Sequence, residues 1–346
     1  MRARGRLLWG GLVALPLLVL FFRGVAWAEL TRAFRSAHPG YLVAVVAASV
    51  ATYGLRAWRW GYLLAPLASV RWRRLFAVTL VGFMTGLLVP RAGEVVRPYL
   101  IARHRNLRTS AAFASIILER LLDLFTVLLL FGLYLYVLPM PAAQRRGPLL
   151  GALKAGAALA GLAALVVLAV LVAFHFHADR AMFVVDRILT RIPRRLATPL
   201  SQMLRSFGEG LAVLQAPARH LFAMAGQSLL LWLTIALGVY WNNRAFGIEL
   251  PFHSVFLILG FLTVGVAVPT PGMVGGFHES YLLAVTEAFG VDKTVAAASG
   301  IALHALTNLP VLVLGLALIG REGLTIGRVA QMAERDPDDP ASGGET

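Results

Sequence analysis

The sequence contains no cysteine, and acidic residues are scarce, since 17 Asp and Glu stand against 32 Lys and Arg in 346 residues. The absence of cysteine excludes disulfides, thiolate metal ligands and a cysteine nucleophile. Charged residues make up only 14% of the chain, against about 25% in a typical soluble domain. With 58% hydrophobic residues and a mean hydropathy of +0.74, this shortage of charge excludes an ordinary soluble fold and predicts an integral membrane protein.

The sequence contains eight long apolar runs. Transmembrane helices need about 17–25 apolar residues, and the runs show little of the period-2 alternation of an outer-membrane barrel. The predicted fold class is therefore an all-α polytopic membrane protein. The apolar runs are 7–22, 41–64, 75–90, 110–138, 149–174, 221–241, 255–268 and 295–319.

The net charge of +15 constrains the topology, because basic residues of membrane proteins concentrate in cytoplasmic loops. If every run crossed the membrane, the arginine-rich segment 175–220 would lie outside. The conflict disappears if the short run 75–90 enters from the cytoplasm, turns at the sequence PRAG and returns. Run 255–268, which ends at the sequence PTPG, would turn back in the same way from outside. The charge is thus explained without a nucleic-acid partner.

This arrangement has about six full transmembrane helices and two re-entrant helical hairpins, related as in an inverted repeat, with both termini cytoplasmic. It places Arg56 and Arg59 among the cytoplasmic basic residues. The N-terminal residues resemble a signal peptide ending near Ala28, but Arg23 and the length of the apolar run favour an uncleaved first helix.

The chain is predicted to form one transmembrane domain, 1–320, and a polar, disordered tail, 321–346. The cytoplasmic connection 175–220 contains amphipathic stretches at 178–192 and 200–214 that suit a membrane surface. An ordinary connecting loop is the alternative.

Ionisable residues at membrane depth are costly unless paired or hydrated, so they mark candidate sites. The first cluster is Arg91, Gly93, Glu94 and Arg97, at the tip and return arm of the first hairpin. Because arginine binds phosphate oxygens bidentately and stays charged, Arg91 and Arg97 are candidate headgroup ligands.

The second cluster, Glu119, Arg120 and Asp123, lies inside the run 110–138. Glu119 and Asp123 share a helix face at i, i+4 spacing. The alternative interpretation is a structural ion-pair network, in which Glu119 binds Arg91 or Arg97 and Arg120 binds Glu94. Such pairing is compatible with a transport role.

The third cluster lies at the second hairpin and in the last apolar run, where His304 and Asn308 share a face. His278, Glu279 and His304 suit a titratable group for proton coupling or cation recognition. A metal site is a weak alternative because the ligands lack close spacing, so we expect neither metal nor cofactor. The cluster comprises Pro271, Gly272, Gly275, Gly276, His278, Glu279, His304 and Asn308.

Three motifs carry a resemblance to a known family: GLLVPRAGEVVRPYL at 86–100, SIILERLLD at 115–123 and PTPGMVGGFHE at 269–279. In this order, they resemble the lysylphosphatidylglycerol synthase transmembrane-region family, whose members are flippase-like membrane proteins. The resemblance spans 7 to 320. The residues that it assigns to the site are Arg91, Gly93, Glu94, Arg97, Glu119, Arg120, Asp123, Pro271, Gly272, Gly275, Gly276 and Glu279. Met273 departs from it, because a small residue is expected there.

The resemblance implies a lipid flippase of the inner, cytoplasmic membrane. The bifunctional relatives carry an aminoacyltransferase for which this chain has no room, so we expect no lipid aminoacylation. The expected substrate has an anionic or zwitterionic headgroup and is a phospholipid, a polyprenyl-phosphate-linked lipid or a hopanoid-type lipid. A non-catalytic partner of a lipid-modifying synthase or glycosyltransferase is the alternative. An intramembrane enzyme is less favoured, since the sequence offers no clear nucleophile. The sequence does not indicate an oligomeric state.

Overall fold

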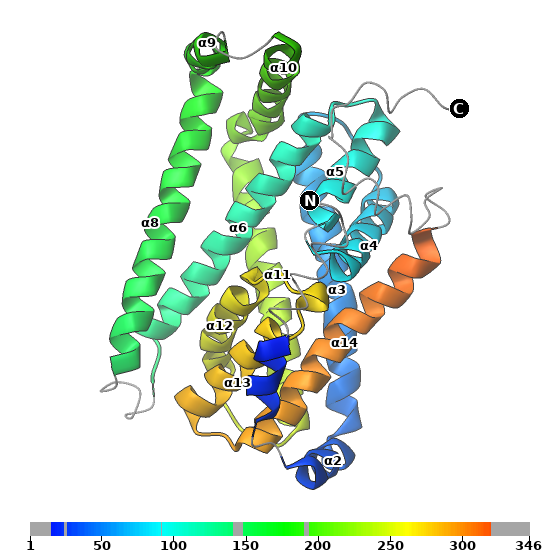
Figure 1. Ribbon diagram of the computed structural model, residues 1–346, viewed down its shortest axis with the longest axis vertical. Helices are drawn as coiled ribbons and strands as arrows, with labels where there is room; N and C mark the ends of the chain where they lie inside the picture. The colour runs from blue at the N-terminus through cyan, green and yellow to red at the C-terminus, as the bar shows by residue number, and fades with distance from the viewer. Residues whose placement is uncertain (1–14, 24–25, 91, 141–147, 190–193, 320–346) are drawn as a thin grey trace.

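The structure is a computed structural model that describes residues 15–23, 26–90, 92–140, 148–189 and 194–319 (Figure 1). Those residues form helices and connecting turns without any strand, which confirms the all-α class. Four helices are long and apolar enough to cross a membrane. They are α3 (Pro39–Leu64), α8 (Pro148–Phe176), α11 (Ala218–Ala245) and α14 (Lys293–Ile319).

A fifth long helix, α6 (Thr109–Tyr136), has 28 residues and differs from these four in its charge. Glu119, Arg120 and Asp123 lie near its middle, so every stretch of transmembrane length along α6 contains all three. Of the predicted first span, residues 15–22 are helical and the remainder lies outside the described residues. The cytoplasmic placement of both termini likewise falls outside them.

The two interrupted apolar runs each form a helical hairpin. The first consists of α4 (Trp72–Leu88) and α5 (Ala92–Arg105), and the second of α12 (Val255–Ala267) and α13 (Gly276–Phe289), joined through the short helix η3 (Pro271–Met273). In Figure 1, α4 and α5 lie in the upper half and α12 and α13 in the lower half of the molecule. Their entry into a membrane from opposite faces stays a prediction.

Both hairpins are closed by a glycine of one arm against a glycine of the other. A Cβ added to Gly93 would overlap the carbonyl oxygen of Gly82, and a Cβ added to Gly276 would overlap that of Gly265. In each hairpin the two glycines are eleven residues apart. Because no side chain separates the arms, their backbones approach closely. The two halves of the chain therefore share one local design.

Amphipathic helices lie at both ends of the molecule. The segment 175–220 forms α9 (Ala178–Leu189), α10 (Arg194–Gly210) and η1 (Leu211–Gln215), close to the predicted amphipathic stretches and at the top of Figure 1. At the bottom lies α2 (Trp27–Ser36), which the sequence analysis did not predict. Its Leu30 is buried, and its Phe34 ring meets Phe246 edge-on at 5.7 Å. The predicted tail 321–346 falls outside the described part of the chain.

The glycine contacts generate a stability prediction. We expect Gly93→Ala and Gly276→Ala each to lower the free energy of unfolding by roughly 1–3 kcal/mol, since the new methyl group forces two backbones apart. Gly156 of α8 has nothing within 4 Å of a Cβ, so Gly156→Ala is the control. Thermal unfolding of detergent-solubilised protein measures the effect. Equal midpoints for all three variants would contradict the close approach.

Candidate functional site

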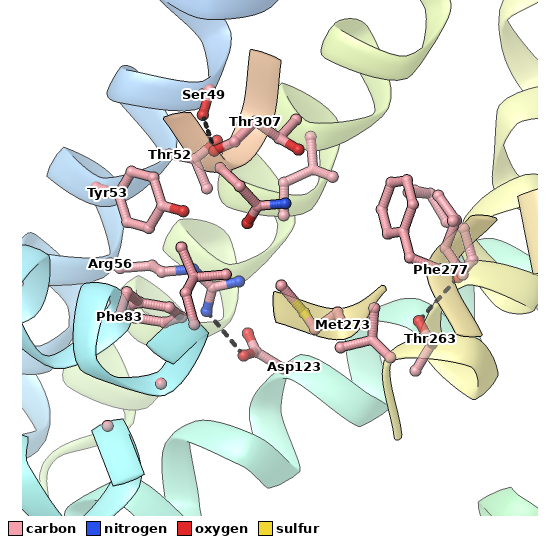
Figure 2. A pocket seen from close by; sticks show the side chains of 18 of the residues that line it. Ser49, Thr52, Tyr53, Arg56, Phe83, Asp123, Thr263, Met273, Phe277 and Thr307 are labelled. Carbon is pink, nitrogen blue, oxygen red and sulfur yellow. Dashed lines mark hydrogen bonds and ion pairs between the residues drawn. The ribbon is translucent and has the colours of Figure 1, made fainter. Parts of the chain in front are cut away.

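A cavity of about 680 Å³ lies where the two hairpin turns meet. Leu87 and Pro90 of the first hairpin line it together with Pro269, Thr270 and Met273 of the second. Helices α3, α6, α11 and α14 complete its wall. Figure 2 shows Arg56 and Asp123 on one side of this space, with Met273 and Phe277 on another. The cavity therefore joins the two interrupted segments that the sequence analysis singled out.

Glu119 of α6 is the centre of a buried ion network beside the cavity. It has no exposed surface, and its two carboxylate oxygens accept hydrogen bonds from the Arg97 guanidinium at 3.0 and 2.9 Å. Arg120 donates to the same carboxylate at 2.8 Å. The predicted pair between Glu119 and Arg97 is confirmed. Arg91, the other predicted partner, lies outside the described residues.

One interpretation of the sequence paired Arg120 with Glu94, but the structure shows no ion pair between these two residues. Its other ion pair is with Asp123, at 3.5 Å, one turn further along the same helix. Glu94 is exposed and lines the cavity. The reason is geometric, because the Arg120 side chain reaches the carboxylates of Glu119 and Asp123 on its own helix.

Two further arginines, which were not among the predicted site residues, belong to the network. The Arg56 and Arg59 guanidiniums of α3 donate to Asp123 at 3.0 and 2.7 Å. Arg59 also donates to Ser228 of α11 at 2.8 Å, while the Trp232 indole donates to Asp123 at 3.1 Å. Arg56 and Arg59 are 8% and 0% exposed. Two arginines inside the apolar run 41–64 were the available signal, since a membrane helix rarely carries unpaired charge.

The network carries more positive than negative charge. Four guanidiniums, those of Arg56, Arg59, Arg97 and Arg120, face the carboxylates of Glu119 and Asp123.

Aromatic rings pack against these guanidiniums. The Arg97 guanidinium carbon lies 4.4 Å from the Trp60 ring centroid, and Phe83 faces Arg56 and Arg97 at 5.1 and 5.3 Å. These cation–π contacts stabilise buried guanidiniums without neutralising them. The site is therefore suited to an anion.

The second hairpin turn is held by histidine. Gly272 and Met273 both have left-handed backbones, with φ of 61° and 59°, a costly conformation for methionine. The His304 Nε2–H of α14 donates to the Gly272 carbonyl at 2.7 Å. The ring of His278 lies 4.5 Å from that of His304, and its Nδ1 accepts from the Gly275 N–H at 3.4 Å. His304 thus braces a strained turn.

The predicted titratable group is assembled only in part, because His278 and His304 meet but Glu279 does not join them. The buried Oε2 of Glu279 has no hydrogen-bond partner among the described residues. No cluster of three His, Cys, Asp or Glu suited to a metal occurs in the part of the chain that the structure describes.

The predicted site residues fall into two groups, apart from Arg91, which lies outside the described residues. Those lining the cavity are Gly93, Glu94, Arg97, Arg120, Asp123 and Asn308, with Glu119 behind them. Those at the second turn but outside the cavity lining are Pro271, Gly272, Gly275, Gly276, His278, Glu279 and His304.

Known proteins place this arrangement in context. A family model described as the lysylphosphatidylglycerol synthase TM region matches residues 7–315, which include both hairpins and the ion network. A UPF0104 membrane protein of Methanothermobacter thermautotrophicus is 24% identical over 330 residues, covering 91% of this chain and 94% of that protein. No solved structure matches the chain significantly.

The ion network generates a second stability prediction. Glu119→Leu leaves the buried Arg97 without its carboxylate, so we expect a loss of roughly 3–5 kcal/mol in the free energy of unfolding. The control is Glu249→Gln, because the exposed pair of Glu249 with Arg244, at 3.5 Å, contributes about 0–1 kcal/mol. Denaturant titration in detergent compares them. An equally small effect of both changes would show that the network is not structural.

Proposed function

Because this chain belongs to the family of the lysylphosphatidylglycerol synthase TM region, we propose that it moves a lipid with an anionic or zwitterionic headgroup between the leaflets of the membrane. The observation that carries this proposal is one cavity, bounded by both hairpin turns, with arginines on one side and apolar residues on another. An amphiphile needs a charged surface and an apolar surface at the same time. The membrane to which we assign the protein is the inner, cytoplasmic one.

The cavity suits part of a lipid. Its apolar wall comes from α11 and α12, where Val239, Leu259, Leu262 and Val266 line it. A volume of about 680 Å³ lies within the usual range of roughly 300–1,000 Å³ for small-molecule pockets, which holds a headgroup and the adjoining carbons. The acyl or isoprenoid tails then remain in the surrounding bilayer, where they are already solvated.

Arg120 and Arg56 are the arginines we assign to the headgroup. Both line the cavity, whereas Arg59 does not line it. The Arg120 side chain is 39% exposed, so it can take a ligand without losing its pairs to Glu119 and Asp123. Held by carboxylates and by the Phe83 ring, the two guanidiniums are ordered before the ligand arrives, which lowers the entropic cost of binding. Phosphate oxygens are the matching acceptors.

Occupied carboxylates favour transport over lipid chemistry. Glu119 accepts from Arg97 and Arg120, and Asp123 accepts from Arg56, Arg59 and Trp232. A general base needs a carboxylate that is free to accept a proton from the reacting group, and the oxygens of these two carboxylates already accept hydrogen bonds from the protein. We therefore assign them the positioning of arginines.

The hairpin turns supply the two gates of the proposed mechanism. Both turns line the cavity, and movement of one hairpin at a time would open the cavity to one side. The closely packed arms in each hairpin favour motion of the pair as a rigid unit. The strained turn at Gly272 and Met273 is the segment we expect to change conformation.

Reconstitution into liposomes tests the proposal. The purified protein should move fluorescent phospholipids or polyprenyl-phosphate sugars between leaflets faster than empty liposomes do. We expect Arg120→Gln to slow this movement about tenfold or more, since it removes a charge-assisted bond to the headgroup. Arg244→Gln, which alters an exposed arginine outside the cavity lining, is the control.

Two outcomes would contradict the proposal. Folded protein that moves none of these lipids would favour the alternative of a partner for a separate lipid-modifying enzyme. Movement that Arg120→Gln and Arg244→Gln affect equally would remove the arginine cluster from the mechanism.

A further inference from the structure

A polar stripe of α3 continues from the arginine cluster along the cavity wall. Ser49, Thr52, Tyr53 and Arg56 all line the cavity, and their spacing of three and four residues places them on one helix face. Figure 2 shows these side chains on the α3 side of the cavity, with Thr307 beside Ser49. In the function proposed above, only Arg56 of this stripe binds the lipid headgroup.

Helix α14 adds two residues to the neutral end. Thr307 and Asn308 line the cavity, and the Ser49 hydroxyl donates to the Thr307 carbonyl at 2.9 Å, which joins the two helices. We call Ser49, Thr52, Tyr53, Thr307 and Asn308 the neutral band. It carries no charged side chain, and Arg56 follows it on α3.

Most hydroxyl protons of the neutral band already form hydrogen bonds within the protein. The Thr52 hydroxyl donates to the Ala48 carbonyl at 2.8 Å, and the Thr307 hydroxyl donates to the Leu303 carbonyl at 2.7 Å. Both hydroxyls therefore present oxygen lone pairs to a ligand.

Asn308 has the same polarity. Its Nδ2 donates to the His304 carbonyl at 2.9 Å. Because only the amide nitrogen can donate to a carbonyl oxygen, this contact fixes the side-chain orientation and leaves Oδ1 as an acceptor, with one N–H still able to donate. Tyr53 is the member whose hydroxyl can donate as well as accept. Acceptors outnumber donors in the band as a whole, which favours a ligand rich in hydrogen-bond donors.

The adjoining charge decides which donors fit. An ammonium group would lie next to Arg56 in a cluster with excess positive charge, which opposes its binding. A quaternary ammonium offers no N–H or O–H donor, and a carboxylate offers only acceptors. Hydroxyl groups supply donors without charge. They also accept from Tyr53.

We propose that the neutral band is a second subsite that binds the hydroxyl groups of a headgroup whose phosphate lies at Arg56 and Arg120. The substrate class is then a phosphate-containing lipid with a glycerol or sugar headgroup. This inference rests on the proposed function and adds to it the selection among headgroups.

The test compares headgroups and isosteric variants in liposomes. Probes are tail-labelled phosphatidylglycerol, phosphatidylethanolamine, phosphatidylcholine and phosphatidic acid. The double variant Thr52→Val, Thr307→Val removes two acceptors without changing shape, and Tyr53→Phe removes one hydroxyl. The control is Thr286→Val, because the Thr286 hydroxyl bonds the Leu282 carbonyl in the same way at 2.9 Å but does not line the cavity.

We expect the unaltered protein to move phosphatidylglycerol fastest of the four. The double variant should slow phosphatidylglycerol about tenfold and phosphatidic acid less than about twofold, because only the first loses hydrogen bonds. Thr286→Val should change neither rate. Equal slowing of both lipids by the double variant, or equal rates for all four headgroups in the unaltered protein, would overturn the second subsite.

The failure of the proposed function looks different. If the unaltered protein moves none of the four lipids, the flippase proposal fails with it. If it moves all four at equal rates and Arg120→Gln slows them alike, the arginine site stands and the second subsite alone is rejected.

Discussion

The bidentate ion pair between Arg97 and Glu119 is the interaction on which the rest of the site depends. It ties α5, the return arm of the first hairpin, to the middle of α6. One turn further on, Asp123 ties α6 to α3 through two more arginines. Ion pairs in so apolar a chain are costly unless their geometry is good and their remaining polar groups are satisfied. Two carboxylates therefore order four guanidiniums and leave a net positive charge facing the cavity.

Glycine sets the second constraint. In each hairpin two glycines eleven residues apart let the arms pack backbone against backbone, so two short helices behave as one element. The turns of these elements then meet at one cavity instead of lying at separate surfaces. The charge cluster contacts the first hairpin through Arg97 of α5, whereas His304 of α14 braces the turn of the second. The two halves of the chain thus share a local design but differ in their chemistry.

Much of this arrangement was predictable from the sequence, for identifiable reasons. The breaks near Pro90 and Pro269 and the distribution of arginines predicted both helical hairpins, and the charges of the first two clusters predicted, as one interpretation, a bond from Glu119 to Arg91 or Arg97. Arg56 and Arg59 were missed because positive-inside reasoning assigns arginines near a helix end to the cytoplasm. Their carboxylate partner is more than sixty residues away, so no local spacing reveals it. Helix α2 was missed because its apolar residues are too few for a span.

The central claim is that the arginine cluster holds a lipid headgroup inside the cavity. A structure determined by electron microscopy in a lipid nanodisc containing phosphatidylglycerol tests it most directly. The account predicts lipid density in the cavity, with phosphate oxygens within hydrogen-bonding distance of Arg56 and Arg120 and tails directed toward the bilayer. An empty, water-filled cavity beside lipids bound only at the outer surface of the helices would contradict it.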